Sequence, residues 1–204
     1  MSKRLTRKVN ADDHVLGPAD APVTLVEYGD FECEHCGHAY PILQSVRKSL
    51  GTRLRFVFRH FPLREAHPHA EHAAEASEAA ARFGGSDAFW AMHNLLFGNQ
   101  DALEDDDLLR YAAEVGLDAR AVDEALASEM FAPRVRADFR SGVRSGVNGT
   151  PTFFVNEARY DGSWMNERDF MRALLDAEAS SERSVAARGL QAPEGPRSEP
   201  RADT

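Results

Sequence analysis

The stretch VTLVEYGDFECEHC, residues 23–36, decides the fold that this chain is expected to adopt. Residues 23–28 are mostly apolar and rich in β-branched side chains, which predicts a strand. Apolar residues recur with helical spacing over 36–50, and residues 54–61 predict a second strand that Pro62 ends. Strand, helix and strand in this order indicate a βαβ unit with a parallel strand pair and a right-handed crossover.

The two cysteines of the chain, Cys33 and Cys36, both lie at the predicted turn from strand to helix. Two cysteines exclude a secreted scaffold held by several disulfides and a zinc site made of four cysteines. A helix N-terminus presents unpaired N–H groups and about half a positive charge, and both favour a thiolate. We therefore expect Cys33 to be the exposed attacking sulfur and Cys36 to be the buried resolving thiol. His35 can stabilise the thiolate, whereas the charge of Glu34 opposes it.

The composition is that of a globular protein with one domain. Of its 204 residues 43% are hydrophobic and 28% charged, and the formal net charge is -9. An acidic chain repels nucleic acid and anionic lipid, so neither is expected as a partner. Basic residues gather at positions 3–8, but no apolar signal-peptide core follows, and no apolar run approaches the roughly 20 residues that span a bilayer. We expect a cytoplasmic protein, and a lone CxxC pair in a reducing cytosol is more often catalytic or metal-binding than structural.

The remaining sequence divides into a few segments. Residues 1–20 are polar and predict a lead-in to the domain. Residues 65–146 show no strand pattern and predict an inserted block of helices, while residues 152–160 predict a β-hairpin. A last helix is predicted over about 166–177, and residues 179–204 predict a disordered tail because they are nearly free of apolar side chains.

Taken together, these motifs resemble the thioredoxin superfamily. A strand–CxxC–helix order and a Thr-Pro pair that enters a late hairpin are its signature, and the inserted helices are similar to its DsbA-like branch. The matching motifs are EYGDFEC at 27–33, FRHFPL at 58–63, HP at 67–68, FWAMH at 89–93, LF at 96–97 and GTPTFF at 149–154. The resemblance, which covers about residues 12–178, implies an α/β thioredoxin fold with an inserted helical subdomain over residues 21–178.

The resemblance also implies roles for single residues. Pro151 matches the family's cis-proline beside the active disulfide, where the backbone edge that includes Thr150 pairs with an extended substrate segment. The same position keeps a metal from bridging the two thiols. Glu27 matches a buried acidic position behind the CxxC motif, where a carboxylate with a raised pKa accepts the proton of Cys36. The chain departs from the pattern at Glu34, because the best-known oxidases of this branch carry proline there.

The implied activity is thiol–disulfide exchange with protein or peptide thiols and a redox partner, without a cofactor. Cys33 and Cys36 would be the redox pair, with His35 and Glu27 as the further catalytic residues. The same scaffold also suits a disulfide reductase or a peroxide-linked thiol enzyme.

Two further alternatives come from other classes. One is a redox sensor that uses the CxxC pair without turnover, and the other is a metal-binding module. Histidines would have to supply further ligands to such a metal, and His60, His67, His69 and His72 are available. The family resemblance accounts for His60 and His67 without a metal. The substrate, the redox partner, the reduction potential and the oligomeric state stay open.

Overall fold

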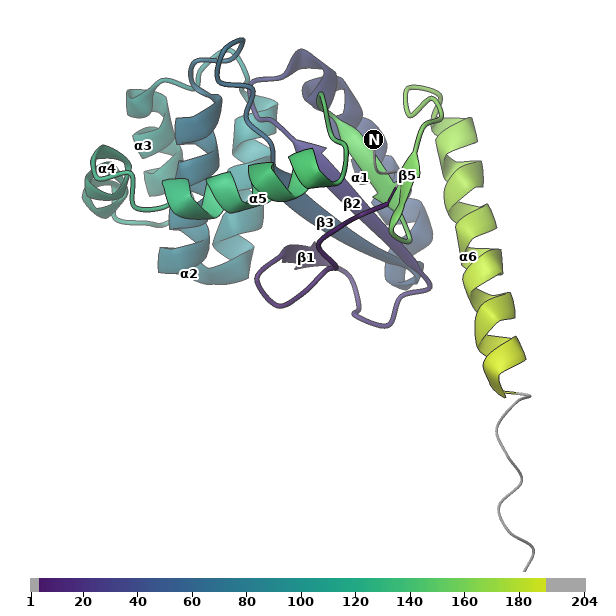
Figure 1. Ribbon diagram of the computed structural model, residues 1–204. Coiled ribbons are helices and arrows are strands. Elements are labelled where there is room, and N and C mark those ends of the chain that lie inside the picture. Colours follow the sequence, from purple (N-terminus) through teal and green to yellow (C-terminus); the bar gives the residue numbers. More distant parts are fainter. Residues whose placement is uncertain (1–3, 190–204) are drawn as a thin grey trace, which may run out of the picture.

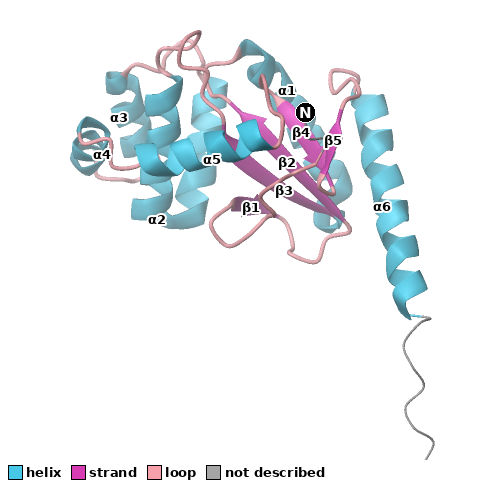
Figure 2. Cartoon of the chain, in the orientation of Figure 1, coloured by secondary structure: helices cyan, strands magenta, loops and turns pink. Residues whose placement is uncertain are grey.

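The computed structural model describes residues 4–189, in which one mixed sheet is covered by helices (Figure 1). Its strands are β1 (His14–Leu16), β2 (Val23–Gly29), β3 (Leu54–His60), β4 (Thr152–Val155) and β5 (Ala158–Tyr160). The strand order is β1-β3-β2-β4-β5, in which β2 and β3 are parallel and the other neighbours are antiparallel. The predicted parallel βαβ unit and the late hairpin are both confirmed (Figure 2).

The helices form two groups. Helices α1 (Glu34–Leu50) and α6 (Glu167–Gly189) belong to the layer around the sheet, with a short 3-10 turn, Gly51–Arg53, after α1. The inserted group consists of α2 (Ala70–Gly98), α3 (Asp105–Glu114), α4 (Ala119–Ala127) and α5 (Ala132–Arg144). These four helices lie within the range predicted for the helical block. In Figure 1, α2, α3 and α4 gather at one side of the sheet, and α5 runs from them across it. The fold is therefore a thioredoxin-like fold with a helical insertion.

The alternating strands bury an apolar core on each face of the sheet. Leu25 of β2 and Phe58 of β3 pack with α1, α2 and α6 in the larger core. Val26 and Tyr28, which alternate with Leu25 along β2, face the smaller core on the other side. Helix α5 covers this smaller core and crosses in front of the sheet in Figure 1. At Gly142 the helix comes so close that a Cβ atom would lie 2.7 Å from the ring of Phe61.

The N-terminal segment is part of the domain, although the sequence predicts only a lead-in over residues 1–20. Strand β1 pairs with β3, and Leu5 is buried in the smaller core. The segment is held by Arg59 of β3, which is fully buried and binds both oxygens of Asp13 through Nε and a terminal nitrogen, at 2.8 and 2.9 Å. The prediction of a mere lead-in was therefore wrong. It failed because a strand of three residues is too short to show a period in the sequence.

The C-terminal boundary also differs from the prediction. Helix α6 continues to Gly189, so the residues 179–189 are helical instead of disordered, and the rest of the predicted tail lies outside the described residues. Phe170 and Leu174 of this helix are buried, whereas Leu175 is 40% exposed. Across residues 4–189, no helix combines the length and the apolar character needed to cross a bilayer.

Candidate active site

The two thiols lie at the N-terminus of α1, as the sequence predicts. Cys33 is the residue that precedes the helix, with φ -73° and ψ 118°, and Cys36 lies in its first turn. Both are free cysteines in this structure. Cys33 is only 5% exposed and Cys36 is fully buried. Cys33 is thus the more accessible of the two cysteines, but it is itself buried, which corrects the expectation of an exposed sulfur.

The loop before β4 brings Thr150 and Pro151 to the cysteines. Tyr28 at the end of β2 pairs with Thr152 at the start of β4, so the preceding residues lie beside the turn that follows β2. The Thr150–Pro151 peptide bond is cis. The Cys33 thiol donates a hydrogen bond to the carbonyl oxygen of Thr150, with 3.4 Å between sulfur and oxygen. Thr150 Oγ1 is buried and has no other partner among the described residues, so it is available to a Cys33 thiolate.

The surroundings push the acidities of the two thiols in opposite directions. A hydrogen bond from Cys36, with others from the Thr150 side chain and from the backbone N–H groups of Cys36 and His35, lowers the pKa of Cys33 to about 5. Burial raises the pKa of Cys36 well above its usual value, and the neighbouring charges of Cys33 and Glu27 add to this. At neutral pH Cys33 is therefore a thiolate and Cys36 a thiol, which is the division of roles that a nucleophile and a resolving group require.

Glu27 lies in β2 on the face that carries the larger core, behind the CxxC motif. Burial, and next the charge of Cys33, raises the pKa of the fully buried Glu27 carboxyl to about 8. Its Oε1 atom has no hydrogen-bond partner within residues 4–189. A Cβ atom on Gly29 would come within 3.3 Å of this oxygen and 2.4 Å of the Phe58 ring, so a side chain there would crowd the carboxyl. A group with this pKa can hold or release a proton near neutral pH.

The side chains of His35 and Glu34 are both exposed on the first turn of α1, whereas the two cysteines are buried. The contribution of His35 that the structure shows is its backbone N–H, which hydrogen-bonds Cys33. Glu34 Oε1 lies 3.8 Å from His38 Nε2, one turn further along the helix. A tuning role for the His35 imidazole stays a prediction.

A second set of polar contacts, which the sequence motifs do not reveal, holds the turn itself. Asp30 Oδ2 accepts hydrogen bonds from the Leu63 backbone at 2.8 Å and from His67 Nδ1 at 2.7 Å. Glu32 Oε2 accepts the backbone N–H of His69 at 2.7 Å. The connection from β3 to α2 is therefore attached to the active-site turn at three points. These partners are 33 to 37 residues apart, which no local pattern reveals.

The histidines considered as metal ligands do not converge. His67 binds Asp30, whereas His72 Nδ1 lies 2.7 Å from Asp105. His60 instead belongs to another group, with His14 and Glu78, whose ligand atoms lie within 4.8 Å of one another.

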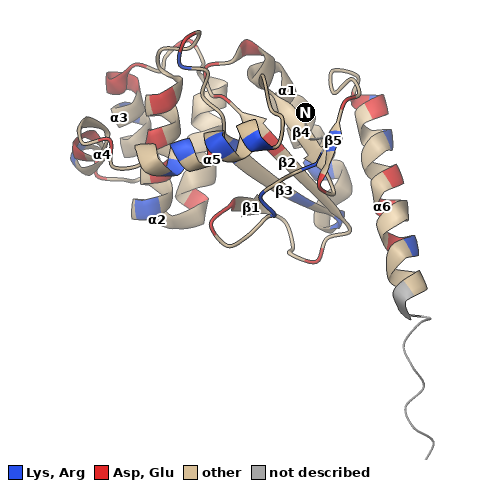
Figure 3. Cartoon of the chain, viewed as in Figure 1, with Lys and Arg blue, Asp and Glu red and all other residues tan. Residues whose placement is uncertain are grey.

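In that group one carboxylate oxygen already engages both imidazoles. Glu78 Oε1 lies 2.9 and 3.0 Å from the Nε2 atoms of His14 and His60. Arg134 Nε lies 3.6 Å from the same oxygen. Arg134 belongs to α5, on whose ribbon the Lys and Arg positions are blue in Figure 3. The Glu78 oxygen that a metal would need is therefore already engaged by two imidazoles and by the Arg134 guanidinium.

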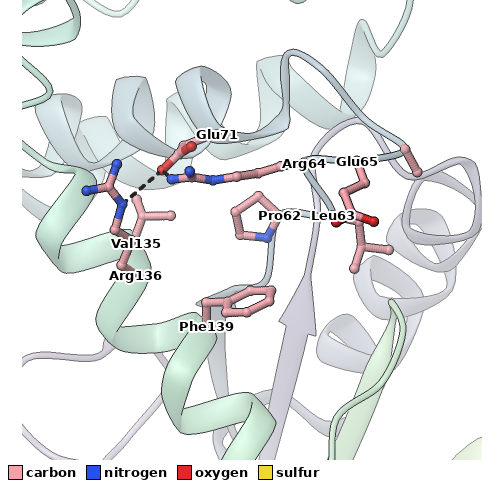
Figure 4. A pocket seen from close by; sticks show the side chains of 9 residues that line it. Pro62, Leu63, Arg64, Glu65, Glu71, Val135, Arg136 and Phe139 are labelled. Carbon is pink, nitrogen blue, oxygen red and sulfur yellow. Dashed lines mark ion pairs between the residues drawn. The ribbon is translucent and has the colours of Figure 1, made fainter.

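A pocket of about 600 Å³ opens between the β3–α2 connection and α5 (Figure 4). Its walls are apolar and include Leu63 and Phe139. At its rim Glu71 pairs with Arg64 and with Arg136. Because the backbone of Leu63 binds Asp30, the pocket is fixed relative to the active-site turn.

Comparison with known proteins agrees with this geometry. A family model described as Thioredoxin matches residues 9–177. BdbD from Bacillus subtilis superposes with a TM-score of 0.78 over 88% of this chain and 100% of its own, at 24% identity. α-DsbA1 from Wolbachia pipientis gives 0.73 over 87% and 96% at 18% identity, which shows the fold alone. A thioredoxin-like oxidoreductase from Silicibacter pomeroyi gives 0.68 over 84% and 94% at 28% identity.

The curated relatives carry a different name. The chain is 47% identical over 169 residues to the Na⁺/H⁺ antiporter NhaA 3 of Salinispora tropica, which is 83% of this chain and 25% of that protein. It is 44% identical over 172 residues to the antiporter NhaA of Herminiimonas arsenicoxydans, or 84% of this chain and 26% of that protein. The chain thus spans about a quarter of the length of these relatives. By its match to the family model, the chain belongs to the thioredoxin family, and its fold is the DsbA-like form with a helical insertion.

Proposed function

We propose that the chain is a thiol–disulfide oxidoreductase that exchanges disulfides with protein or peptide thiols through Cys33 and Cys36. One observation carries this proposal: Cys33 and Cys36 lie at the N-terminus of α1 beside the cis Thr150–Pro151 bond, with 3.4 Å between the Cys33 sulfur and the Thr150 carbonyl oxygen. In this setting the pKa of Cys33 is lowered to about 5, and that of Cys36 is raised. A nucleophile that is ionised at neutral pH stands beside a thiol that is protonated until it is needed.

In the oxidising direction, a substrate thiolate attacks Cys33 Sγ of the Cys33–Cys36 disulfide. The S–S bond breaks, Cys36 leaves with the electron pair and takes a proton, and a mixed disulfide joins the substrate to Cys33. A second substrate thiolate then attacks the substrate sulfur and releases Cys33 as a thiolate. The substrate loses two electrons, which reduce the enzyme disulfide. In the reducing direction Cys36 loses its proton to Glu27 and resolves the mixed disulfide.

The backbone beside Cys33 would orient the substrate. The edge at Thr150 and Pro151 lies against the reacting sulfur, and an extended substrate segment would pair with it. Stabilising the Cys33 thiolate makes the disulfide form more oxidising, and a protonated His35 would add to this effect. We further propose a cytoplasmic setting, in which a redox partner, itself a thiol or a disulfide, regenerates the enzyme.

Two variants test the proposal with an insulin disulfide as the substrate. We expect Cys33→Ser to abolish exchange, because it removes the nucleophile. We expect Cys36→Ser to accumulate mixed disulfides through Cys33, which non-reducing gels and mass spectrometry detect. Insulin reduction by Cys33→Ser at the wild-type rate would show that the assignment is wrong.

A second candidate is a redox sensor that acts on a transporter without turnover. The specific observation is that relatives at 47% identity are named Na⁺/H⁺ antiporters. For this candidate, oxidation of the CxxC pair would change the rate of cation exchange by the partner protein. Vesicles containing the Salinispora tropica antiporter provide the test, with the redox buffer as the variable. A sensor changes the rate of cation exchange between oxidising and reducing buffer. In the antiporter whose thioredoxin-like region is replaced by this chain, Cys33→Ser should remove that response.

A further inference from the structure

Gln100 reaches the active-site turn from the helical insertion. It follows α2, and its side-chain Nε2 donates to the backbone oxygens of Phe31 and Cys33, at 2.8 and 2.9 Å. Both acceptors belong to the segment that carries the nucleophile. One carboxamide therefore spans the turn from a position 67 residues away from Cys33.

These two carbonyl groups determine how the turn faces Cys33 Sγ. The Cys33 carbonyl also accepts the backbone N–H of Gly37 at 3.0 Å, so it begins the hydrogen-bond ladder of α1. In a trans peptide the N–H points opposite to the C=O, so holding the Phe31 and Cys33 carbonyls fixes the peptide planes that carry the Glu32 and Glu34 N–H groups. The Cys33–Glu34 plane begins the first turn of α1, so its orientation also sets the position of the N–H groups that follow in that turn. The Glu32 N–H beyond Phe31 meets Asp30 Oδ1 at 2.9 Å. Further into the turn, the N–H groups of His35 and Cys36 reach the Cys33 sulfur.

The first turn of α1 is shaped around the Gln100 carboxamide. A Cβ atom on Gly37 would lie 1.8 Å from Gln100 Oε1 and 2.7 Å from its Cδ. The adjoining helices are packed firmly at this end, because Tyr40 of α1 stacks on Phe97 of α2 with 5.5 Å between ring centroids. The tyrosine hydroxyl also donates to Asn94 Oδ1 at 3.0 Å. The carboxamide thus lies in a fixed space that glycine leaves open.

We propose that Gln100 is a positioning residue for the exchange reaction: by holding the Phe31 and Cys33 carbonyls, it makes the turn present N–H groups to the Cys33 sulfur. The inference rests on the proposed function for its effect on exchange. Its effect on the Cys33 thiolate is independent of any substrate. The helical insertion then contributes directly to the redox site.

The test compares Gln100→Glu and Gln100→Ala with Asn99→Asp. Glutamate keeps the shape but replaces the donor by acceptors that face two carbonyl oxygens, and alanine removes the donor without adding charge. Asn99→Asp is the matched control, because it makes the same charge change one residue away, where the Asn99 amide is exposed and binds Leu95 O at 2.8 Å. The readout is the pH dependence of iodoacetamide alkylation of Cys33 in the reduced protein.

We expect both Gln100 variants to alkylate at least threefold more slowly than the wild type near pH 5, because a smaller fraction of Cys33 is ionised. We expect Asn99→Asp to stay within a factor of 1.5 of the wild type. The equilibrium constant for the oxidation of reduced glutathione by the enzyme disulfide, measured in a glutathione redox buffer, should fall at least threefold in the same two variants. Equal alkylation profiles for Gln100→Ala, Asn99→Asp and the wild type would overturn the inference.

Gly37→Ala supplies a second measurement that does not change Gln100. When Gln100 is present, the added Cβ displaces its carboxamide, so the alkylation profile of Gly37→Ala should shift as that of Gln100→Ala does. In the Gln100→Ala background the space is empty, and the same change should add no further shift. Additive shifts in the double variant would contradict the proposal. Alkylation needs no exchange partner, so a wild type without exchange activity would reject the proposed function while these profiles still decide the role of Gln100.

Discussion

At the scale of single residues, the site depends on a few hydrogen bonds to one sulfur atom. The Thr150 hydroxyl is buried and lacks another partner in the described chain. Its hydrogen bond lowers the pKa of Cys33, and only the hydrogen bond from Cys36 lowers that pKa more. We expect Thr150→Val to move the alkylation midpoint of Cys33 upward from about 5. Hydrogen bonds to charged groups contribute about 1.5–3 kcal/mol, so the midpoint should rise by roughly one to two pH units.

Thr152→Val is the matched control for this change. Thr152 is also largely buried, but its hydroxyl donates to Gly149 O at 2.7 Å instead of facing the sulfur. Its alkylation midpoint should therefore equal that of the wild type. If both valine variants shift the midpoint equally, a general disturbance of the loop explains the result and the Thr150 hydroxyl has no special part.

Glu27 gives the folded protein a characteristic dependence on pH. Its pKa is about 8 in the folded state against an ordinary 4.5, because the site is buried. The folded state thus holds the proton more tightly than the unfolded state, so the free energy of unfolding falls as pH rises from about 4.5 to about 8. We expect Glu27→Gln to remove this fall and to be more stable than its parent at pH 8, by about 2–4 kcal/mol.

Urea unfolding at pH 5 and pH 8 measures the effect. Both proteins should carry Cys33→Ser, because a thiolate with a lowered pKa has the opposite pH dependence over the same range. Parallel stability profiles with and without Glu27 would mean that the carboxyl is ionised without penalty and is no proton store.

At the scale of elements, the β3–α2 connection should respond to pH through His67. Burial alone would lower the pKa of His67, but the hydrogen bond and charge of Asp30 raise it above 6.5. A raised histidine pKa gives a stabilisation that is complete below about 6.5 and is lost as pH rises through the folded-state value. We expect His67→Gln to destabilise the protein by roughly 1 kcal/mol at pH 5.5 and by less at pH 9.

His72→Gln is the control for that experiment, since His72 makes a 2.7 Å pair with Asp105 of similar geometry but at the surface. Exposed ion pairs contribute little, so its effect should be small at both pH values. A His67 variant whose loss of stability is the same at pH 5.5 and pH 9 would contradict the assignment of the Asp30 pair as charged.

The elements also show what the sequence can predict here. Strands and helices with a clear period, such as β2, α1 and β3, are predicted within a residue or two, and the CxxC turn lies between them. Strand β1 has three residues and therefore no period, and the polar end of α6 has a composition that also suits a disordered segment. A segment with few apolar residues cannot form a core of its own, which is why the sequence predicts disorder there. A solvent-exposed helical end that continues a packed helix needs no such core.

At the scale of the whole molecule, the site is assembled from distant segments: the β2–α1 turn, the β3–α2 connection, Gln100 after α2, and the loop before β4. Motifs within one segment identified Cys33 and Cys36, and the family resemblance supplied Thr150 and Pro151. Gln100 and Asp30 were missed, because their contacts join residues 67 and 37 apart. Such pairings exist only after the insertion has packed against the sheet.

The N-terminal segment is held against the sheet, on the side of the smaller core, by buried charge. Asp13 binds Arg59 through two hydrogen bonds and also lies 2.7 Å from Arg7, and Arg59 donates to the Tyr28 hydroxyl at 3.0 Å. We expect Asp13→Ala to lower the free energy of unfolding by about 3–5 kcal/mol, because a fully buried guanidinium would lose its counter-charge. Urea unfolding at pH 7 measures the change.

Asp12→Ala is the adjacent control, because Asp12 is exposed and should change stability by less than about 0.5 kcal/mol. Acid provides an independent check on the sign. Burial opposes ionisation of Asp13, but the arginines outweigh it and lower its pKa, so the stabilisation is present above the ordinary value of 3.8 and is lost as pH falls below it. The difference between wild type and Asp13→Ala should therefore shrink in acid. A difference that stays constant down to pH 2 would show that the aspartate holds the segment by shape and not by charge.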